Sequence, residues 1–139
     1  MKVPKRRLYL LNEAFMNKPL LGLIIGGALG ILDGLSALVS APEVAPHIVT
    51  IVIGSMGKGL VAGLVIGLLA RKVNNLGVGV VFGLLVGALL ALPIAMNKDP
   101  STGQAYFWEI LIPGSIVGLI VGYATQRYGT RPQPSIARN

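Results

Sequence analysis

The sequence predicts an all-α polytopic membrane protein: four transmembrane helices, built as two tandem helical hairpins with glycine-zipper packing. Three observations carry this prediction. Of the 139 residues, 53% are apolar and only 12% are charged, a balance that is unusual for a soluble domain. Four apolar runs each have about the 20 residues that a helix needs to cross a bilayer. Each run also carries small residues four positions apart, which lets membrane helices approach closely.

The four apolar runs define the predicted elements in order. The spans are residues 19–41, 48–70, 76–96 and 106–125, which together form one membrane domain over residues 19–125. Only helices and closed barrels satisfy their backbone in lipid, and these runs lack the alternation of barrel strands, so helices are predicted. The flanking segments are a basic, interfacial N-terminal segment over 1–18 and a basic cytoplasmic tail over 126–139.

The positions of the basic residues predict the topology. The first connection between spans has no Lys or Arg, the second has Arg71 and Lys72, the third has only Lys98, and both tails are basic. The positive-inside rule therefore predicts a multi-pass protein of the cell inner (cytoplasmic) membrane with both termini cytoplasmic. The net charge of +7 follows this pattern. We expect the lipid bilayer as a partner and no nucleic acid.

A cleaved signal peptide is the alternative for the first run. A basic segment precedes the run, and the small residues of Val39–Ser40–Ala41 have cleavage-site spacing. The run is too long for a signal core, however, and Asp33 interrupts it. A membrane span is therefore favoured.

An internal repeat relates the two halves of the membrane domain. Gly59–Lys72 aligns with Gly114–Arg127 at a constant offset of 55, and three glycines and the basic end coincide. The first and third spans align less closely, at an offset of 57. The pattern predicts two hairpins in the same orientation, a parallel repeat of the kind that some transporters use.

Small residues form a row along every predicted span. The glycines of these rows are Gly22, Gly26, Gly30 and Gly34; Gly59, Gly63 and Gly67; Gly79, Gly83 and Gly87; and Gly114, Gly118 and Gly122. Such rows indicate close helix packing. The first interpretation is that all four rows are used inside one bundle. The alternative is that some rows face another subunit, which would give a homo-oligomer.

Two opposite charges lie inside the first two spans. Asp33 precedes the first connection by about as many residues as Lys58 follows it, which places both near the middle of the bilayer at similar depth. A charge there costs about 3 kcal/mol on insertion scales, and such residues usually pair and mark a functional path. The pair either fixes the register of one hairpin or forms a transport site, and both possibilities stay open.

Glu109 and Pro113 are the further candidates, in the fourth span. Pro113 clashes with the carbonyl group four residues before it and removes one hydrogen bond, which predicts a kink or an opening of the helix. In the repeat, Pro113 occupies the position of Lys58. The alternative is an ordinary proline kink beside an interfacial glutamate, because membrane helices tolerate proline well.

Several kinds of chemistry have little support. The chain has no cysteine, and His47 is its only histidine, so no metal site and no cofactor are expected. The glycine-rich stretches 54–59 and 77–83 lack the spacing of phosphate-binding and dinucleotide-binding loops. No nucleophile has a positioned base, so we do not expect an enzyme.

In outline, the two glycine-rich hairpins resemble the duplicated proteolipids of rotary ATPase rings. The resemblance fails at the ion-binding residue. Those proteolipids carry a carboxylate midway along an even-numbered span, and Lys58 and Pro113 occupy the corresponding positions here. Membership of that family is therefore not inferred.

Two functions follow as hypotheses. The first is a channel-like or transporter-like bundle that moves a small solute, ion or proton past Asp33 and Lys58. The second is a non-catalytic accessory or scaffold subunit of a larger membrane complex. Both hypotheses allow a homo-oligomer.

Overall fold

A computed structural model of the chain describes residues 4–100 and 102–130. Its helices are α1 (Lys5–Met16), α2 (Lys18–Ser40), the 3₁₀-helix η1 (Pro42–His47), α3 (Ile48–Lys72), α4 (Leu76–Met96) and α5 (Phe107–Tyr128). Over the described residues the protein is all-helical, with a single isolated β-bridge between Asn17 and Thr130. Within those residues, four helices are long and apolar enough to cross a membrane.

Local sequence signals explain where these helices begin and end. Asn17 has an extended backbone and Pro19 occupies the first turn of α2, where its missing N–H group costs nothing. At the start of α4, the Asn75 side chain accepts a hydrogen bond of 3.2 Å from the backbone N–H group of Val78. The basic pair Arg71 and Lys72 ends α3, where positive charge interacts favourably with the helix dipole.

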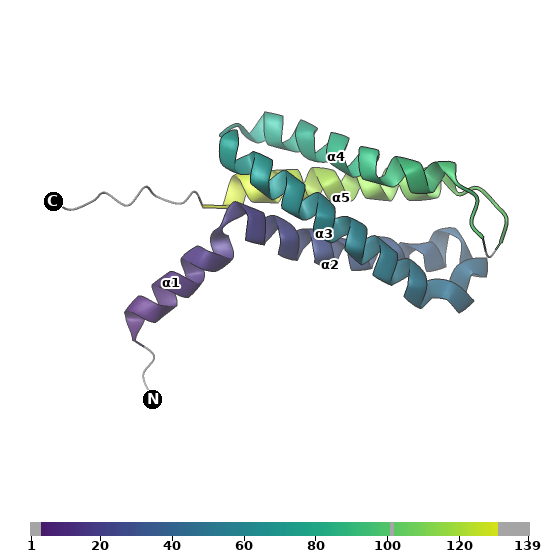
Figure 1. Ribbon diagram of the computed structural model, residues 1–139, viewed down its shortest axis with the longest axis horizontal. Coiled ribbons are helices and arrows are strands. Elements are labelled where there is room, and N and C mark those ends of the chain that lie inside the picture. The colour runs from purple at the N-terminus through teal and green to yellow at the C-terminus, as the bar shows by residue number, and fades with distance from the viewer. Residues whose placement is uncertain (1–3, 101, 131–139) are drawn as a thin grey trace.

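The long helices form an antiparallel bundle (Figure 1). The α2 helix packs mainly along α3, and α4 packs mainly along α5. Figure 1 shows the start of α2 and the end of α5 at the same end of the bundle as the α3–α4 turn, where α1 projects away from the other helices. The opposite end holds η1 and the connection between α4 and α5. We call the end with the α3–α4 turn the inner end, and the end with η1 the outer end.

Glycine residues lie where the helices come closest. A Cβ atom added at Gly22 or Gly63 would collide with the backbone of the other residue, and the same holds for the pair Gly83 and Gly118. Most of the remaining glycines of the four predicted rows approach backbone atoms of the described chain in the same way: Gly26 at Gly59, Gly30 at Ser55, Gly34 at Val52, Gly67 at Lys18, Gly87 at Gly114 and Gly122 at Gly79. A Cβ atom added at Gly79 would instead meet the side chain of Gln126. Each of these rows is therefore occupied within one chain.

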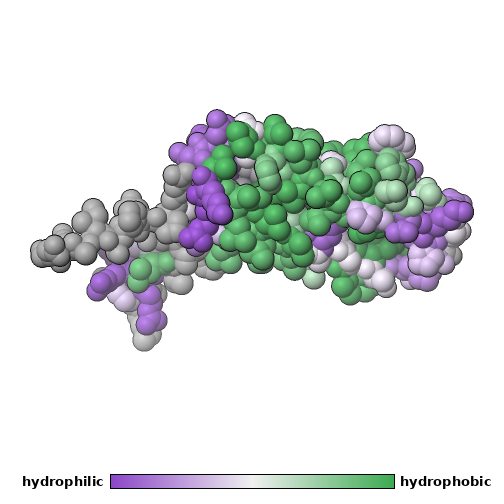
Figure 2. Space-filling view, turned by 45° about the horizontal axis from the view of Figure 1, so that its top comes forward, coloured by the Kyte–Doolittle hydropathy of each residue, from purple (hydrophilic) through white to green (hydrophobic). Residues whose placement is uncertain are grey.

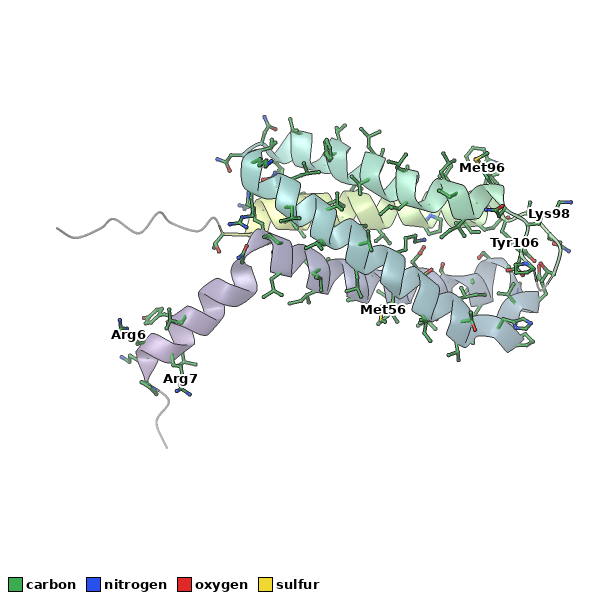
Figure 3. The ribbon with its side chains drawn as sticks, viewed as in Figure 1. Arg6, Arg7, Met56, Met96, Lys98 and Tyr106 are labelled. Atoms are coloured by element: carbon green, nitrogen blue, oxygen red, sulfur yellow. The ribbon has the colours of Figure 1, made fainter. Side chains whose placement is uncertain are left out.

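The outer surface of the bundle is apolar. Large hydrophobic side chains are exposed along all four long helices, among them Leu32, Ile53, Leu85 and Ile116. In Figure 2 hydrophobic residues cover the middle of the molecule, and hydrophilic residues gather at its two ends. Figure 3 shows Arg6 in α1 beyond the inner end and Lys98 at the outer end. An apolar belt between polar ends is what a bilayer requires.

The helix bounds differ slightly from the predicted spans. Helix α5 continues to Tyr128, beyond the predicted end at residue 125, and α3 continues to Lys72, beyond residue 70. Most of the predicted tail, with Arg131 and Arg138, lies outside the described residues, as do Lys2 and the other residues of 1–3. The division of the chain into 1–18, 19–125 and 126–139 stays a prediction.

Candidate functional site

Asp33 and Lys58 form an ion pair between α2 and α3. The Lys58 ammonium nitrogen lies 2.8 Å from Oδ2 of Asp33. The side chains keep only 11% and 6% of their surface exposed, for Lys58 and Asp33 respectively. At this distance the ammonium donates a charge-assisted hydrogen bond to the carboxylate. Two charges that would each be costly alone inside the membrane thus compensate each other.

The close approach of the two helices sets up this contact. A Cβ atom added at Gly30 would lie 2.5 Å from the carbonyl oxygen of Ser55, so the two backbones nearly touch there. Asp33 and Lys58 each follow these contact positions by three residues, which places both on the facing sides of their helices. Ser36 is satisfied locally, since its hydroxyl donates to the carbonyl of Asp33 at 2.6 Å.

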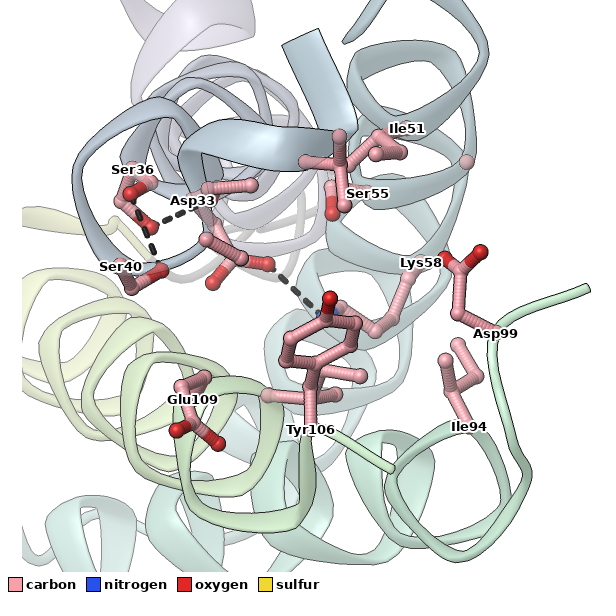
Figure 4. Close-up of a pocket in the computed structure, with 15 residues that line it drawn as sticks. Asp33, Ser36, Ser40, Ile51, Ser55, Lys58, Ile94, Asp99, Tyr106 and Glu109 are labelled. Carbon is pink, nitrogen blue, oxygen red and sulfur yellow. Dashed lines mark hydrogen bonds and ion pairs between the residues drawn. The ribbon is translucent and has the colours of Figure 1, made fainter. Parts of the chain in front are cut away.

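The ion pair lies in the wall of a cavity of about 200 Å³ at the outer half of the bundle. Figure 4 shows Asp33, Lys58, Tyr106 and Glu109 around this space, with Asp99 reaching it from the α4–α5 connection. The apolar part of the wall is formed by Ala37, Ala41, Val44, Ile51, Ile94 and Ile110. The site therefore combines fixed charges with an aliphatic lining.

Helix α5 closes the cavity on a third side. A Cβ atom added at Gly114 would lie 3.6 Å from the Lys58 ammonium nitrogen, so the lysine reaches across to α5. Helix α5 runs unbroken through Pro113, so the helix does not open there, and the alternative of a kink stays a prediction. Two residues further, the Ser115 hydroxyl donates to the carbonyl of Leu111 at 2.7 Å.

Glu109 and Pro113 lie differently with respect to the ion pair. Glu109 lines the cavity, whereas Pro113 does not and instead lines an open groove of about 420 Å³ between α2 and α5. Ser36, Ser40 and Glu109 line both spaces, so the groove adjoins the cavity. Of the four candidate residues from the sequence, Asp33, Lys58 and Glu109 therefore line the cavity, and Pro113 lines the groove that adjoins it.

A hydrogen bond joins η1 to the start of α5 at the outer end. The Tyr106 hydroxyl donates to Oε1 of Glu43 at 2.6 Å. The bond to the carboxylate raises the pKa of the Tyr106 phenol above its usual value, because it favours the protonated form. Tyr106 also lines the cavity, so this bond fixes one part of its outer rim.

Sequence reasoning missed a second buried lysine, at the inner end. Lys18 is only 2% exposed, and its ammonium donates to the carbonyl of Ala70 and to Oε1 of Gln126, both at 2.9 Å. The Gln126 amide in turn donates to the carbonyl of Val73 at 2.7 Å. A signal was available, since Lys18 stands four residues before Gly22 and thus shares the packed face of α2.

These observations define a helical multi-pass membrane protein. The chain matches no known family model, no curated protein and no solved structure. Within residues 4–100 and 102–130 no group of three or more His, Cys, Asp and Glu side chains could hold a metal ion. Any statement about function therefore depends on the geometry of the site.

Proposed function

We propose that this protein is a channel-like or transporter-like bundle that moves a small solute, ion or proton past Asp33 and Lys58. The observation that carries the proposal is the ion pair in the wall of a cavity of about 200 Å³. A pair that only fixed helix register could be packed over on all sides. A cavity beside it provides room for a transported species.

The bundle also has two ends suited to different roles. Near the inner end, hydrogen bonds of Lys18 to Ala70 and Gln126 connect α2, α3 and α5, and the space beside Gln126 between α3, α4 and α5 is only about 40 Å³. A bundle that is open around its charged site at one end and closed at the other has the form of one state of an alternating-access cycle. Passage would then require the inner contacts to separate.

We further propose the finer architecture and topology that the sequence predicts. The paired glycine contacts of α2 with α3 and of α4 with α5 support two tandem hairpins with glycine-zipper packing. Arg71, Lys72 and Arg127 end their helices at the inner end, which supports an inner membrane location with both termini cytoplasmic. The absence of catalytic activity stays a prediction.

Flux measurements in proteoliposomes test the proposal. Wild type, Asp33→Asn and Lys58→Met are compared for proton, cation and anion flux, and Gly57→Ala is the control. Gly57 adjoins Lys58 in sequence, but a Cβ atom added there meets nothing within 4 Å. We expect wild type and Gly57→Ala to conduct equally and both charge variants to lose most of the flux. Equal flux from all four proteins would refute a transport role for the pair.

An accessory or scaffold subunit is the second candidate. Among the four candidate membrane spans of the structure, the span Pro42–Lys72, which contains α3, has only 17% of its apolar stretch buried, against 28% for each of the other three. This face of the bundle is therefore the most available to a larger partner or to a second copy of the chain. If the purified protein shows no flux, capture from native membranes should yield one partner in fixed ratio. Cross-linking in the membrane would detect a homo-oligomer.

A further inference from the structure

We infer that the cavity beside Asp33 and Lys58 binds a small organic cation, an alkylammonium ion with a short aliphatic body. The inference rests on the proposed function and names the class of ligand for the same site. It follows from the charge of the lining, the nature of the walls and the group that already occupies part of the site.

The charge of the lining favours a cation. Carboxylates of Asp33, Asp99 and Glu109 are among the described lining residues, whereas Lys58 is the only lysine or arginine among them. The Asp33 carboxylate is nearly buried, and one of its oxygens already accepts the Lys58 ammonium. A ligand with one positive charge would reduce the negative excess of this lining. An anion would increase it.

The walls favour an organic ion over a small inorganic one. Most of the surface of the lining is apolar, and two of the aliphatic residues that contribute to it, Ala41 and Val44, are almost completely buried. A hydrated metal ion gains nothing from such walls, whereas an alkyl chain loses unfavourable contact with water. Cavities of about 150 Å³ accept a molecule the size of benzene, so about 200 Å³ suffices for an amine of five or six heavy atoms.

The site already binds an alkylammonium group. The Lys58 side chain is itself an aliphatic chain that ends in a primary ammonium, and it contacts Asp33 at 2.8 Å with 11% exposure. The protein thereby shows that these surroundings can accommodate such a group. A free alkylammonium would bind the carboxylate of Glu109 and the second oxygen of Asp33, or would compete with Lys58 for Asp33. The groove between α2 and α5 adjoins the cavity at Ser36, Ser40 and Glu109. It gives the alkylammonium ion a route into the cavity from the side of the bundle.

Calorimetric titration of the purified full-length protein in detergent micelles tests the inference. The probes are butylammonium, butanol and butyrate, which differ mainly in charge. We expect saturable binding of butylammonium only. Asp33→Asn should weaken it at least about tenfold, since a desolvated charge partner is lost. Glu109→Gln, at the exposed rim, should weaken it about threefold. The control Lys72→Gln, which removes a charge at the inner end of α3, should leave the affinity unchanged.

Lys58→Met separates a cation site from an anion site, because the two predict opposite results. A cation site should bind butylammonium about tenfold more tightly once the competing lysine is removed, measured at mildly alkaline pH. An anion site should instead bind butyrate in wild type and lose it in Lys58→Met, which would overturn the inference. Equal affinity for butylammonium in wild type and Glu109→Gln would also overturn it, even if Asp33→Asn fails to fold.

The result also separates this inference from the transport proposal. Flux of another solute that depends on Asp33, without butylammonium binding, would leave transport standing and refute the ligand class. Binding without any flux would confirm the site and refute transport.

Discussion

Two buried lysines of this bundle have different surroundings. Lys58, at the outer half, contacts a carboxylate at 2.8 Å and borders a cavity of about 200 Å³. Lys18, at the inner end, donates hydrogen bonds to the carbonyl of Ala70 and to the amide oxygen of Gln126, and it does not line that cavity. One lysine thus lies beside space for a ligand, whereas the other links neighbouring helices.

The difference teaches that burial of a charge does not by itself indicate a ligand site. At the inner end, the lysine amine replaces water as the hydrogen-bond donor to a helix carbonyl and to a side-chain amide, and links three helices. At the outer half, the charge is compensated by another charge beside open space. The cavity, and not the buried charge, distinguishes a candidate transport site from a structural contact.

The largest expected effect concerns the backbone contact that closes the inner half. Gly63→Ala should lower the free energy of unfolding by about 3 kcal/mol or more, because the added methyl group collides with the backbone of Gly22. Gly57→Ala on the same helix meets nothing within 4 Å and should be neutral or stabilising by up to about 1 kcal/mol. Unfolding in detergent, followed by circular dichroism, measures both. Similar stability of the two variants would contradict the described packing.

The next effect concerns the ion pair. Lys58→Met should lower the free energy of unfolding by about 2 kcal/mol. This loss is smaller than for a fully buried ion pair, because the adjacent cavity admits water to the Asp33 carboxylate that remains. The exchange Asp33→Lys with Lys58→Asp should recover most of this stability if the two charges interact only with each other. A ligand site should nevertheless lose flux in the exchanged protein. Full flux in the protein with exchanged charges would show that the ion pair of Asp33 and Lys58 has only a structural role.

A smaller effect is expected at the inner end. Lys18→Met removes the hydrogen-bond donor to Ala70 and Gln126. It should lower the free energy of unfolding by about 1 to 2 kcal/mol, the usual cost of a buried acceptor without a partner. Thermal unfolding in micelles checks this value. Butylammonium affinity should stay at the wild-type value, because Lys18 does not line the outer cavity. Loss of that affinity would break the division between the two ends.

The smallest effect concerns the outer rim. Glu43→Gln should lower the pKa of Tyr106 toward its usual value, because the neutral amide no longer favours the protonated phenol. Ultraviolet titration of tyrosinate measures it, with Tyr106→Phe identifying the signal among the four tyrosines. Wild type should therefore ionise Tyr106 at higher pH than the variant. Identical titration curves would show that the bond is absent in solution.

Much of the fold could be predicted from the sequence because its signals are local. The four long apolar helices were predicted from run length and the intervening polar turns, and the structure confirms them as candidate membrane spans. Counting residues along two helices joined by a short connection predicted a similar depth for Asp33 and Lys58, and their contact at 2.8 Å agrees with it. Helical periodicity predicted that Asp33 shares the face of Gly26 and Gly30.

Other features could not be predicted because they depend on distant parts of the chain. The burial of Lys18 requires Ala70 and Gln126, which lie 52 and 108 residues away in sequence. Glu109 lines both the cavity and the groove whereas Pro113 lines only the groove, and these positions depend on how α5 is placed against α2. By its place at the start of α2, Lys18 is predicted to lie at the membrane interface. Only the packing of distant helices against it buries its side chain.

The sequence by itself determined that the chain is helical and spans a membrane, because hydropathy and helix length act within each segment regardless of its neighbours. Tertiary structure alone decided that Lys58 lines a cavity of about 200 Å³ whereas Lys18 links α2 to Ala70 and Gln126. The reason is that a cavity is the volume left unfilled by side chains from several helices, and no single segment specifies it.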